Sequence, residues 1–254
     1  MDNLTTPYSL ERHLQALCAQ DGSFDNLLAT WSLNKRSCAE GLKTVAQNFP
    51  HYSVHDDRHS ETILSNMEML LGEKRIAVLS PTDTWLLLQV AYLHDFGMAL
   101  LYERVESVWG DEDFQDYLKE LRESFNPSLK EASLYLNALH ENLGNKDFEK
   151  SWPLKVRRYT TQVIAGYFRG KHADLSAAYA EQMKTCWGID LTHSGLIPGR
   201  LIKLIGRISS LHTRDTKEVL ELDYRTDGYG ADYAHPRFIA EMLRLGDLLD
   251  ADSG

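Results

Sequence analysis

An almost unbroken apolar run over residues 85–93, followed at once by His94 and Asp95, limits what this chain can fold into more than any other feature. Residues 80–83 (Ser-Pro-Thr-Asp) form a helix-start signal in front of it, and Gly97 marks the expected exit from the helix. A helix that is apolar nearly all round is buried by its neighbours. Burying an imidazole and a carboxylate at its end is costly unless they are paired or bound to a metal ion, and a metal is the obvious candidate.

Helical periodicity dominates the rest of the chain as well. Residues 8–48 read as two or three scaffold helices, and the polar stretch 52–61 leads into an amphipathic stripe that stops near Gly72. Residues 102–150 form a polar, acidic insertion in which Pro127 separates two helices. The charged runs of this insertion are solvated helix faces or, alternatively, part of a lid over a substrate. We find no internal repeat and no convincing strand, so the predicted fold class is all-α.

Three later helices also carry candidate ligands beside apolar residues. An apolar helix in a basic setting, within residues 153–175, ends at His172, and an amphipathic helix over residues 197–211 precedes His212. The last helix begins after Pro236, and it carries Asp247, Asp250 and Asp252. Each of these residues is weak evidence alone, because a single histidine is more often a core or surface residue than a ligand.

The composition is that of an ordinary globular protein. With 254 residues, of which 43% are hydrophobic and 25% charged, the chain is long enough for one large domain or two small ones, and we expect one. The N-terminus lacks the features of a secretory leader, and no apolar run approaches the roughly 20 residues that cross a bilayer, so we expect no membrane insertion. The three cysteines share no motif, which favours a reducing cytoplasm over a disulfide framework.

Taken together, the candidate ligands follow a recognisable order: a histidine, an adjacent His-Asp pair on a buried helix, two further histidines and a distal aspartate. In this chain they are His59, His94, Asp95, His172, His212 and Asp247. The series resembles the HD superfamily of metal-dependent phosphohydrolases over roughly residues 50–252. The stretches 55–61, 169–174 and 243–250 look like the bacterial HD domains, sometimes called HD-CE, that are found attached to heat-shock-type GHKL ATPase domains. Residues 1–49 would then be a helical scaffold of the same domain, and residues 50–254 its metal-binding part.

The resemblance implies roles for these ligands. His59, His94, Asp95 and Asp247 would be the core metal ligands, with Asp95 as the bridge between two ions. His172 and His212 match the positions that complete a second site in the two-metal branch of the superfamily. One or two divalent ions held this way would attract a phosphate and lower the pKa of a bound water towards neutrality, so that hydroxide attacks phosphorus. Mixed nitrogen and oxygen ligands suit Mn, Fe, Co, Ni or Zn better than Ca or Mg.

The resemblance also suggests residues that act on the substrate. Cyclic-nucleotide phosphodiesterases share this architecture and carry a similar His-x-x-x-His, which makes His55 the candidate catalytic acid beside Asp95. A helix-capping or supporting role for His55 stays open. The candidates for holding phosphate oxygens are Arg169, Lys171 and Arg207. Asp57 and Asp250 are candidates for orienting ligand imidazoles, although surface salt bridges would suit all five of these charged residues equally well.

The function predicted from the sequence is a metal-dependent phosphohydrolase acting on a nucleotide or another small phosphoester. The chain lacks the Gly-Tyr-Pro signature of the HD-GYP group, which argues against a cyclic-di-nucleotide substrate. A second hypothesis is a regulatory or scaffold HD domain that binds a nucleotide or protein partner and controls an attached ATPase, as the abrupt C-terminus and the acidic insertion suggest. A third is a metal-dependent nuclease of a defence system. The net charge of −10 argues against the third unless the basic run 155–171 lines a groove.

Overall fold

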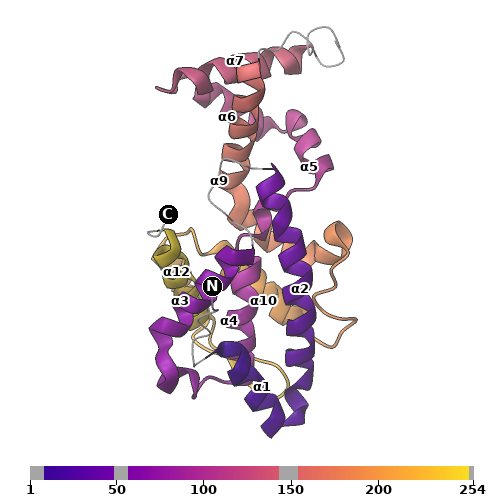
Figure 1. Ribbon diagram of the computed structural model, residues 1–254, viewed down its shortest axis with the longest axis vertical. Helices are drawn as coiled ribbons and strands as arrows, with labels where there is room; N and C mark the ends of the chain where they lie inside the picture. Colours follow the sequence, from indigo (N-terminus) through magenta and orange to yellow (C-terminus); the bar gives the residue numbers. More distant parts are fainter. Residues whose placement is uncertain (1–8, 49–56, 143–153, 252–254) are drawn as a thin grey trace, which may run out of the picture. The chain divides into compact units, whose positions relative to one another are not determined.

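The computed structural model describes residues 9–48, 57–142 and 154–251, and within them the chain is mostly helical, which confirms the all-α fold class (Figure 1). Two compact units form. The first comprises Met1–Thr44, Ser53–Ala99 and His172–Gly254, and the second comprises Val45–Tyr52 and Leu100–Lys171. Helices α2 (Asp25–Asn48) and α9 (Leu154–Trp187) contribute to both units.

The first unit is built around the apolar run singled out in the sequence, which forms α4 (Pro81–Leu93). The other elements of this unit are α1 (Leu10–Gln20), η1 (Gly22–Phe24), α2 (Asp25–Asn48), α3 (Asp57–Ile76), η2 (Phe96–Met98), α10 (Gly199–Ser210), α11 (Thr216–Val219) and α12 (Pro236–Ala251). Helices α3 and α12 are far apart in the sequence and lie side by side (Figure 1). Both also contact α4, as do α1 and α10.

Local chemistry explains where α4 begins and why it is central. The Oγ atom of Ser80 accepts a hydrogen bond of 3.1 Å from the backbone N–H of Asp83, and Pro81 occupies the first turn, so the predicted start signal is confirmed. Every side chain from Thr82 to Leu93 is buried. The helix ends at Leu93, and His94 is its C-cap residue. The sequence therefore located the core helix and its polar end correctly.

The structure corrects the predicted end of one helix and adds a pair of strands. Helix α9 does not end at His172 but continues to Trp187, because neither proline nor glycine interrupts residues 173–187; Gly188, with a φ of 69°, follows its end. The loop predicted without strands contains a short antiparallel pair, β1 (Thr226–Asp227) and β2 (Tyr233–Ala234), in which Thr226 faces Ala234. Strands of two residues are too short to show an alternating pattern.

The second unit corresponds largely to the acidic insertion. It contains α5 (Tyr102–Ser107), η3 (Val108–Gly110), α6 (Glu112–Arg122) and α7 (Pro127–Glu141), with Pro127 at the start of its helix as predicted. The unit has a small core of its own, in which the Phe114 ring contacts those of Trp109 and Tyr167 at centroid distances of 5.5 Å and 5.0 Å. Polar runs in the sequence thus surround an aromatic cluster.

Cys18 and Cys38 are buried and Cys186 is partly exposed, and all three are free thiols. No single described helix is long and apolar enough to cross a membrane. One bent pair of segments, Pro81–Met98 with Glu103–Gly110, meets the length and composition test together, as the buried core helix of a soluble protein also does.

Candidate metal centre

Six polar side chains predicted as ligands converge in the first unit. His59 lies in the first turn of α3, and His94 and Asp95 directly follow α4. The others are His172 in α9, His212 just after α10 and Asp247 in α12. His94 is fully buried, and the side chains of His59 and His212 are only 6% and 2% exposed. Residues from five helical regions thus meet at the end of the core helix.

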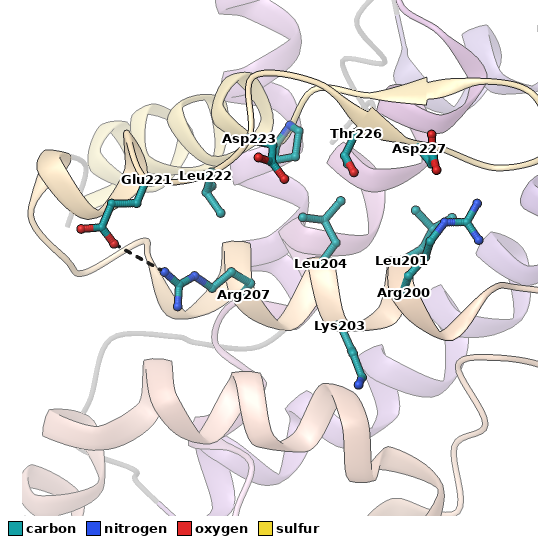
Figure 2. A pocket seen from close by; sticks show the side chains of 11 residues that line it. Arg200, Leu201, Lys203, Leu204, Arg207, Glu221, Leu222, Asp223, Thr226 and Asp227 are labelled. Atoms are coloured by element: carbon teal, nitrogen blue, oxygen red, sulfur yellow. Dashed lines mark ion pairs between the residues drawn. The ribbon is translucent and has the colours of Figure 1, made fainter.

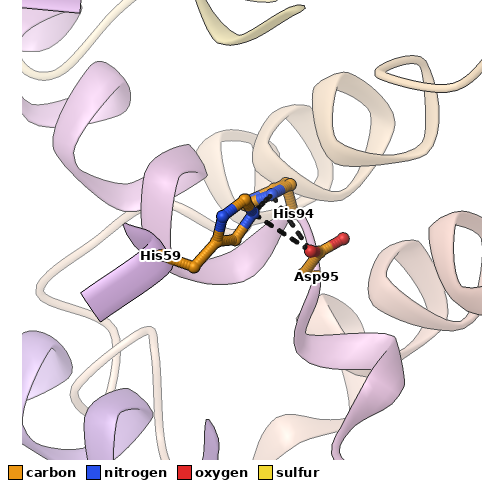
Figure 3. A group of neighbouring side chains, drawn as sticks. All are labelled: His59, His94 and Asp95. Atoms are coloured by element: carbon orange, nitrogen blue, oxygen red, sulfur yellow. Dashed lines mark hydrogen bonds and ion pairs between the residues drawn. The ribbon is translucent and has the colours of Figure 1, made fainter. Parts of the chain in front are cut away.

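Asp95 occupies the middle of this cluster, and its two oxygens face different histidines. Oδ2 lies 3.3 Å from Nε2 of His59 and 3.4 Å from Nε2 of His94, and Figure 3 shows these three side chains pointing toward one another. Oδ1 lies 3.2 Å from Nε2 of His172 and 3.5 Å from Nε2 of His212. One carboxylate is therefore shared between two pairs of imidazoles.

We call the two groups the first and the second half-site. The first half-site consists of His59, His94 and Oδ2 of Asp95, with Oδ1 of Asp247 at 3.5 Å from Nε2 of His59. The second half-site consists of Oδ1 of Asp95, His172 and His212. In each three-residue group the ligand atoms lie within 4.8 Å of one another.

Hydrogen bonds on the far side of the rings fix how three of the histidines present their nitrogens. Nδ1 of His59 lies 2.6 Å from Oδ2 of Asp250, Nδ1 of His94 lies 3.1 Å from the Ala91 carbonyl, and Nδ1 of His212 lies 2.5 Å from the Ser209 carbonyl. Each oxygen accepts a hydrogen bond from the Nδ1–H group, so a neutral ring carries its lone pair on Nε2. Metal-bound histidines commonly have such partners.

The packing of the ring nitrogens tests whether a metal ion fits here. Nε2 of His59 lies 3.2 Å from Nε2 of His94, and Nε2 of His172 lies 2.9 Å from Nε2 of His212. With both rings neutral, two lone pairs of the first half-site would face one another in a buried place. A cation among them, either a proton or a metal ion, removes this repulsion, and the nitrogen and oxygen donors suit a divalent transition metal.

The charges around the first half-site shift its histidines in opposite directions. Burial alone would lower the pKa of His59, but the carboxylates of Asp95, Asp250 and Asp247 outweigh burial and raise it to about 9. Burial lowers the pKa of His94, which Asp95 opposes, and the neighbouring His212 and His59 lower it further. Without a metal ion, these opposite shifts favour a proton on His59 over one on His94.

A comparison with models of protein families identifies the chain independently of the geometry of this cluster. The HD-CE model matches residues 49–254, which is most of the chain. The chain belongs to the HD-CE family, within the HD superfamily. HD domains are typically metal-dependent phosphohydrolases. Comparisons with curated proteins and with solved structures found no match.

The residues predicted to act on the substrate of this HD-CE domain are not all brought to the cluster. His55 lies outside the residues that the structure describes. Arg169 and Lys171 belong to the second unit, where Lys171 forms an ion pair with Asp113 and lies 4.7 Å from the centre of the Tyr167 ring. Their roles in binding phosphate stay predictions. Of the two carboxylates predicted to orient histidines, Asp250 contacts His59, whereas no described hydrogen bond joins Asp57 to the cluster.

Arg207 lies along a groove of about 330 Å³ between α10 and residues 221–227 (Figure 2). Its guanidinium is 3.9 Å from Glu221, and both side chains are exposed. Arg200, on the same helix, donates a hydrogen bond to the Gly228 carbonyl, and Lys203 points away from residues 221–227 (Figure 2). No described contact joins Arg207 to the histidines, so its predicted role also stays a prediction.

Gly97 has a function that the sequence did not reveal. The expected exit signal was wrong, because α4 already ends at Leu93 and Gly97 lies in the following 3-10 turn. A Cβ atom at Gly97 would lie only 2.0 Å from the His172 carbonyl oxygen, and its N–H donates a hydrogen bond of 2.7 Å to Oγ of Ser176. Glycine is required because the backbone after Asp95 packs directly against α9. The signal in the sequence was a glycine two residues after the His-Asp pair.

Proposed function

We propose that this HD-CE domain is a metal-dependent phosphohydrolase that cleaves a nucleotide or another small phosphoester. The observation that carries the proposal is the carboxylate of Asp95, whose two oxygens face two separate pairs of histidines. Such a shared carboxylate suits two divalent ions held close together. The typical activity of the superfamily supports the same reaction class.

The chain offers enough donors for two ions. The first half-site would use His59, His94, Asp95 and Asp247, and the second would use Asp95, His172 and His212. Mn, Fe, Co, Ni and Zn are the candidate metals. When bound, divalent ions supply local positive charge for a phosphoester and activate water as a nucleophile near neutral pH.

The protein's own residues would prepare and complete the site. The Nδ1 hydrogen bonds of His59, His94 and His212 hold their Nε2 atoms toward the shared carboxylate, which lowers the cost of organising ligands when an ion binds. His55 is proposed to protonate the leaving oxygen. The cations proposed to hold phosphate oxygens are Arg169, Lys171 and Arg207, although Lys171 would first have to release Asp113. A cytoplasmic location and an attached ATPase domain are part of the same proposal.

The test combines metal analysis with a panel of phosphomonoesters, nucleotides and phosphodiesters, assayed with each candidate metal. His94→Ala and Asp95→Ala should each lower both metal content and turnover by more than about a hundredfold, because loss of a supporting residue alone costs about 10- to 100-fold. His13→Ala is the matched control, since His13 contacts the Leu79 carbonyl outside the cluster. Full hydrolysis by both site variants would contradict the proposal.

A regulatory domain is the second candidate, and the separate core of the second unit favours it. A unit with its own buried aromatic cluster can fold as an independent surface for a partner. Tight metal or nucleotide binding without turnover on any ester would support this alternative. Cleavage of RNA or plasmid DNA in the presence of Mn would instead support a nuclease.

A further inference from the structure

An ion pair links the two segments that carry the histidines of the second half-site. Asp174 follows His172 by two residues in α9, and Arg214 follows His212 by two residues in the turn after α10. Nη2 of Arg214 donates to both carboxylate oxygens of Asp174, at 2.7 Å each. The side-chain pair thus links two elements whose histidines, His172 and His212, have their Nε2 atoms 2.9 Å apart.

The two half-sites are held together in different ways. In the first, Asp250 contacts the ligand His59 directly. In the second, α9 is joined to the segment after Asp95 through the hydrogen bond between Gly97 and Ser176. The pair of Asp174 and Arg214 supplies the corresponding link between α9 and the end of α10. These two links together connect the three segments that carry Asp95, His172 and His212.

Because this ion pair is exposed to solvent, removing it should change the stability of the fold very little, so its effect on the positions of the histidines can be measured separately. The side chains of Arg214 and Asp174 are 44% and 61% exposed. Exposed ion pairs contribute little to global stability because water competes with them and side-chain entropy opposes them. The charge-assisted contact nevertheless limits how far apart the two segments that carry Arg214 and Asp174 can move while it persists.

We propose that Asp174 and Arg214 are positioning residues for the second half-site. They hold the segments that carry His172 and His212 close together, so the affinity of the second half-site for metal would depend on them and that of the first would not. This inference rests on the proposed function, because it assumes that both half-sites bind metal.

The variants must account for a neighbouring carboxylate. Glu218 in α11 also lies close enough to raise the pKa of Arg214, after the larger effect of Asp174, so it is an alternative partner when Asp174 is merely removed. Charge reversal is therefore more informative than truncation. Asp174→Arg and Arg214→Asp each place like charges opposite one another, and the double variant restores an opposite pair.

The experiment is a titration of the metal-free full chain with Co²⁺, followed by its d–d absorption and by calorimetry. We expect each single reversal to weaken the second bound ion about tenfold and to leave the first within about twofold, which is the size typical of supporting contacts. The double variant should recover to within about threefold of the wild type. Lys184→Ala is the matched control, because it removes another ion pair of α9, with Asp190 at 2.8 Å, and should change neither affinity.

Several results would overturn the inference. Single reversals that bind both ions as the wild type does would contradict the positioning role, and so would equal weakening of both ions. Circular dichroism and thermal unfolding would show whether a variant has lost its fold. If the single reversals unfold, Arg214→Lys, which keeps the charge, is used instead. This variant should still bind the second ion, but more weakly than the wild type does, and any other result would refute the positioning role. A wild type that binds one ion overturns the positioning role, whereas a wild type that binds none overturns the proposed function as well.

Discussion

The two half-sites use the same kinds of ligand but are supported by different means. His59 and His94 face Oδ2 of Asp95, with Asp247 beside them and Asp250 behind the His59 ring. Among the described contacts, the second half-site shares the carboxylate of Asp95 and has a backbone carbonyl behind the His212 ring, and further contacts link the segments that carry its histidines. Direct contacts orient a ligand, whereas contacts between segments place it. The comparison indicates that the first half-site is sensitive to charge and the second to backbone position.

Burial follows the same division only in part. The side chains of His59 and His94 are 6% and 0% exposed; in the second half-site that of His172 is 15% exposed, but that of His212 is only 2% exposed. More carboxylates and less solvent favour tighter retention of a cation, provided that the ligands stay paired. We therefore expect the first half-site to bind its ion more tightly than the second.

The largest effect should come from Gly97→Ala, which tests the placement of the second half-site. The new Cβ would lie 2.0 Å from the backbone oxygen of His172, so α9 or the segment after Asp95 must move. We expect the free energy of unfolding to fall by about 3 kcal/mol or more, as in severe overpacking, and the second ion to bind more weakly than the first. Urea unfolding and metal titration measure both.

Gly199→Ala is the control for this variant, because nothing lies within 4 Å of its added Cβ. It should leave the urea midpoint nearly unchanged. If Gly97→Ala behaved in the same way, backbone contact between the two segments would not be what places His172.

A pH effect tests the charge of the first half-site. The pKa of His59 is raised from 6.5 to about 9, so in metal-free protein the proton on His59 stabilises the fold fully below pH 6.5. This contribution, up to about 3 kcal/mol, is lost as the pH rises from 6.5 to 9. Urea unfolding after chelation measures it.

Because other groups also titrate in this range, the measurement is the difference from His59→Gln, in which the contribution is absent. A bound metal ion should abolish the same pH dependence, since it displaces the proton. An identical slope in the variant and in the metal-free wild type would show that the carboxylates do not hold a proton in the first half-site.

The smallest effect should come from Asp250→Asn, which weakens the orientation of His59. We expect the first ion to bind about 10- to 100-fold more weakly and the second to change by less than about twofold. Glu241→Gln is the matched control on α12, because Glu241 is only 3.8 Å from Arg244 and contacts no ligand of the cluster among the described residues. Equal weakening of both ions would mean that the half-sites do not differ in the way proposed.

The sequence predicted what local chemistry determines. The Ser80 cap, the burial of α4 and the position of His94 at its end follow from nearby residues, and the structure confirms them. The order of the six ligand candidates also identified residues that converge in space. This success depended on the resemblance to a family, because no single histidine was informative.

The features that the sequence missed depend on contacts between distant segments. The approach of Gly97 to His172 joins residues 75 positions apart (172 − 97), and the partners Asp174 and Arg214 are 40 positions apart. No periodicity reports such contacts. The small core of the second unit was hidden in the same way, because Phe114 and Tyr167 become neighbours only when α6 packs near α9 within that unit. The extent of α9 to Trp187, by contrast, was predictable from the lack of proline and glycine.

If both half-sites bind ions, the position of Asp95 between them would make the two binding events thermodynamically dependent. Each oxygen of its carboxylate faces one pair of histidines, so an ion that fixes this carboxylate would change the free energy of binding the next ion. By reciprocity, the factor by which the first ion alters the affinity of the second must equal the factor by which the second alters that of the first. The filling of the two half-sites would then be coupled: positive coupling would make both ions respond to a narrow range of free metal concentration, whereas negative coupling would separate their binding into two steps.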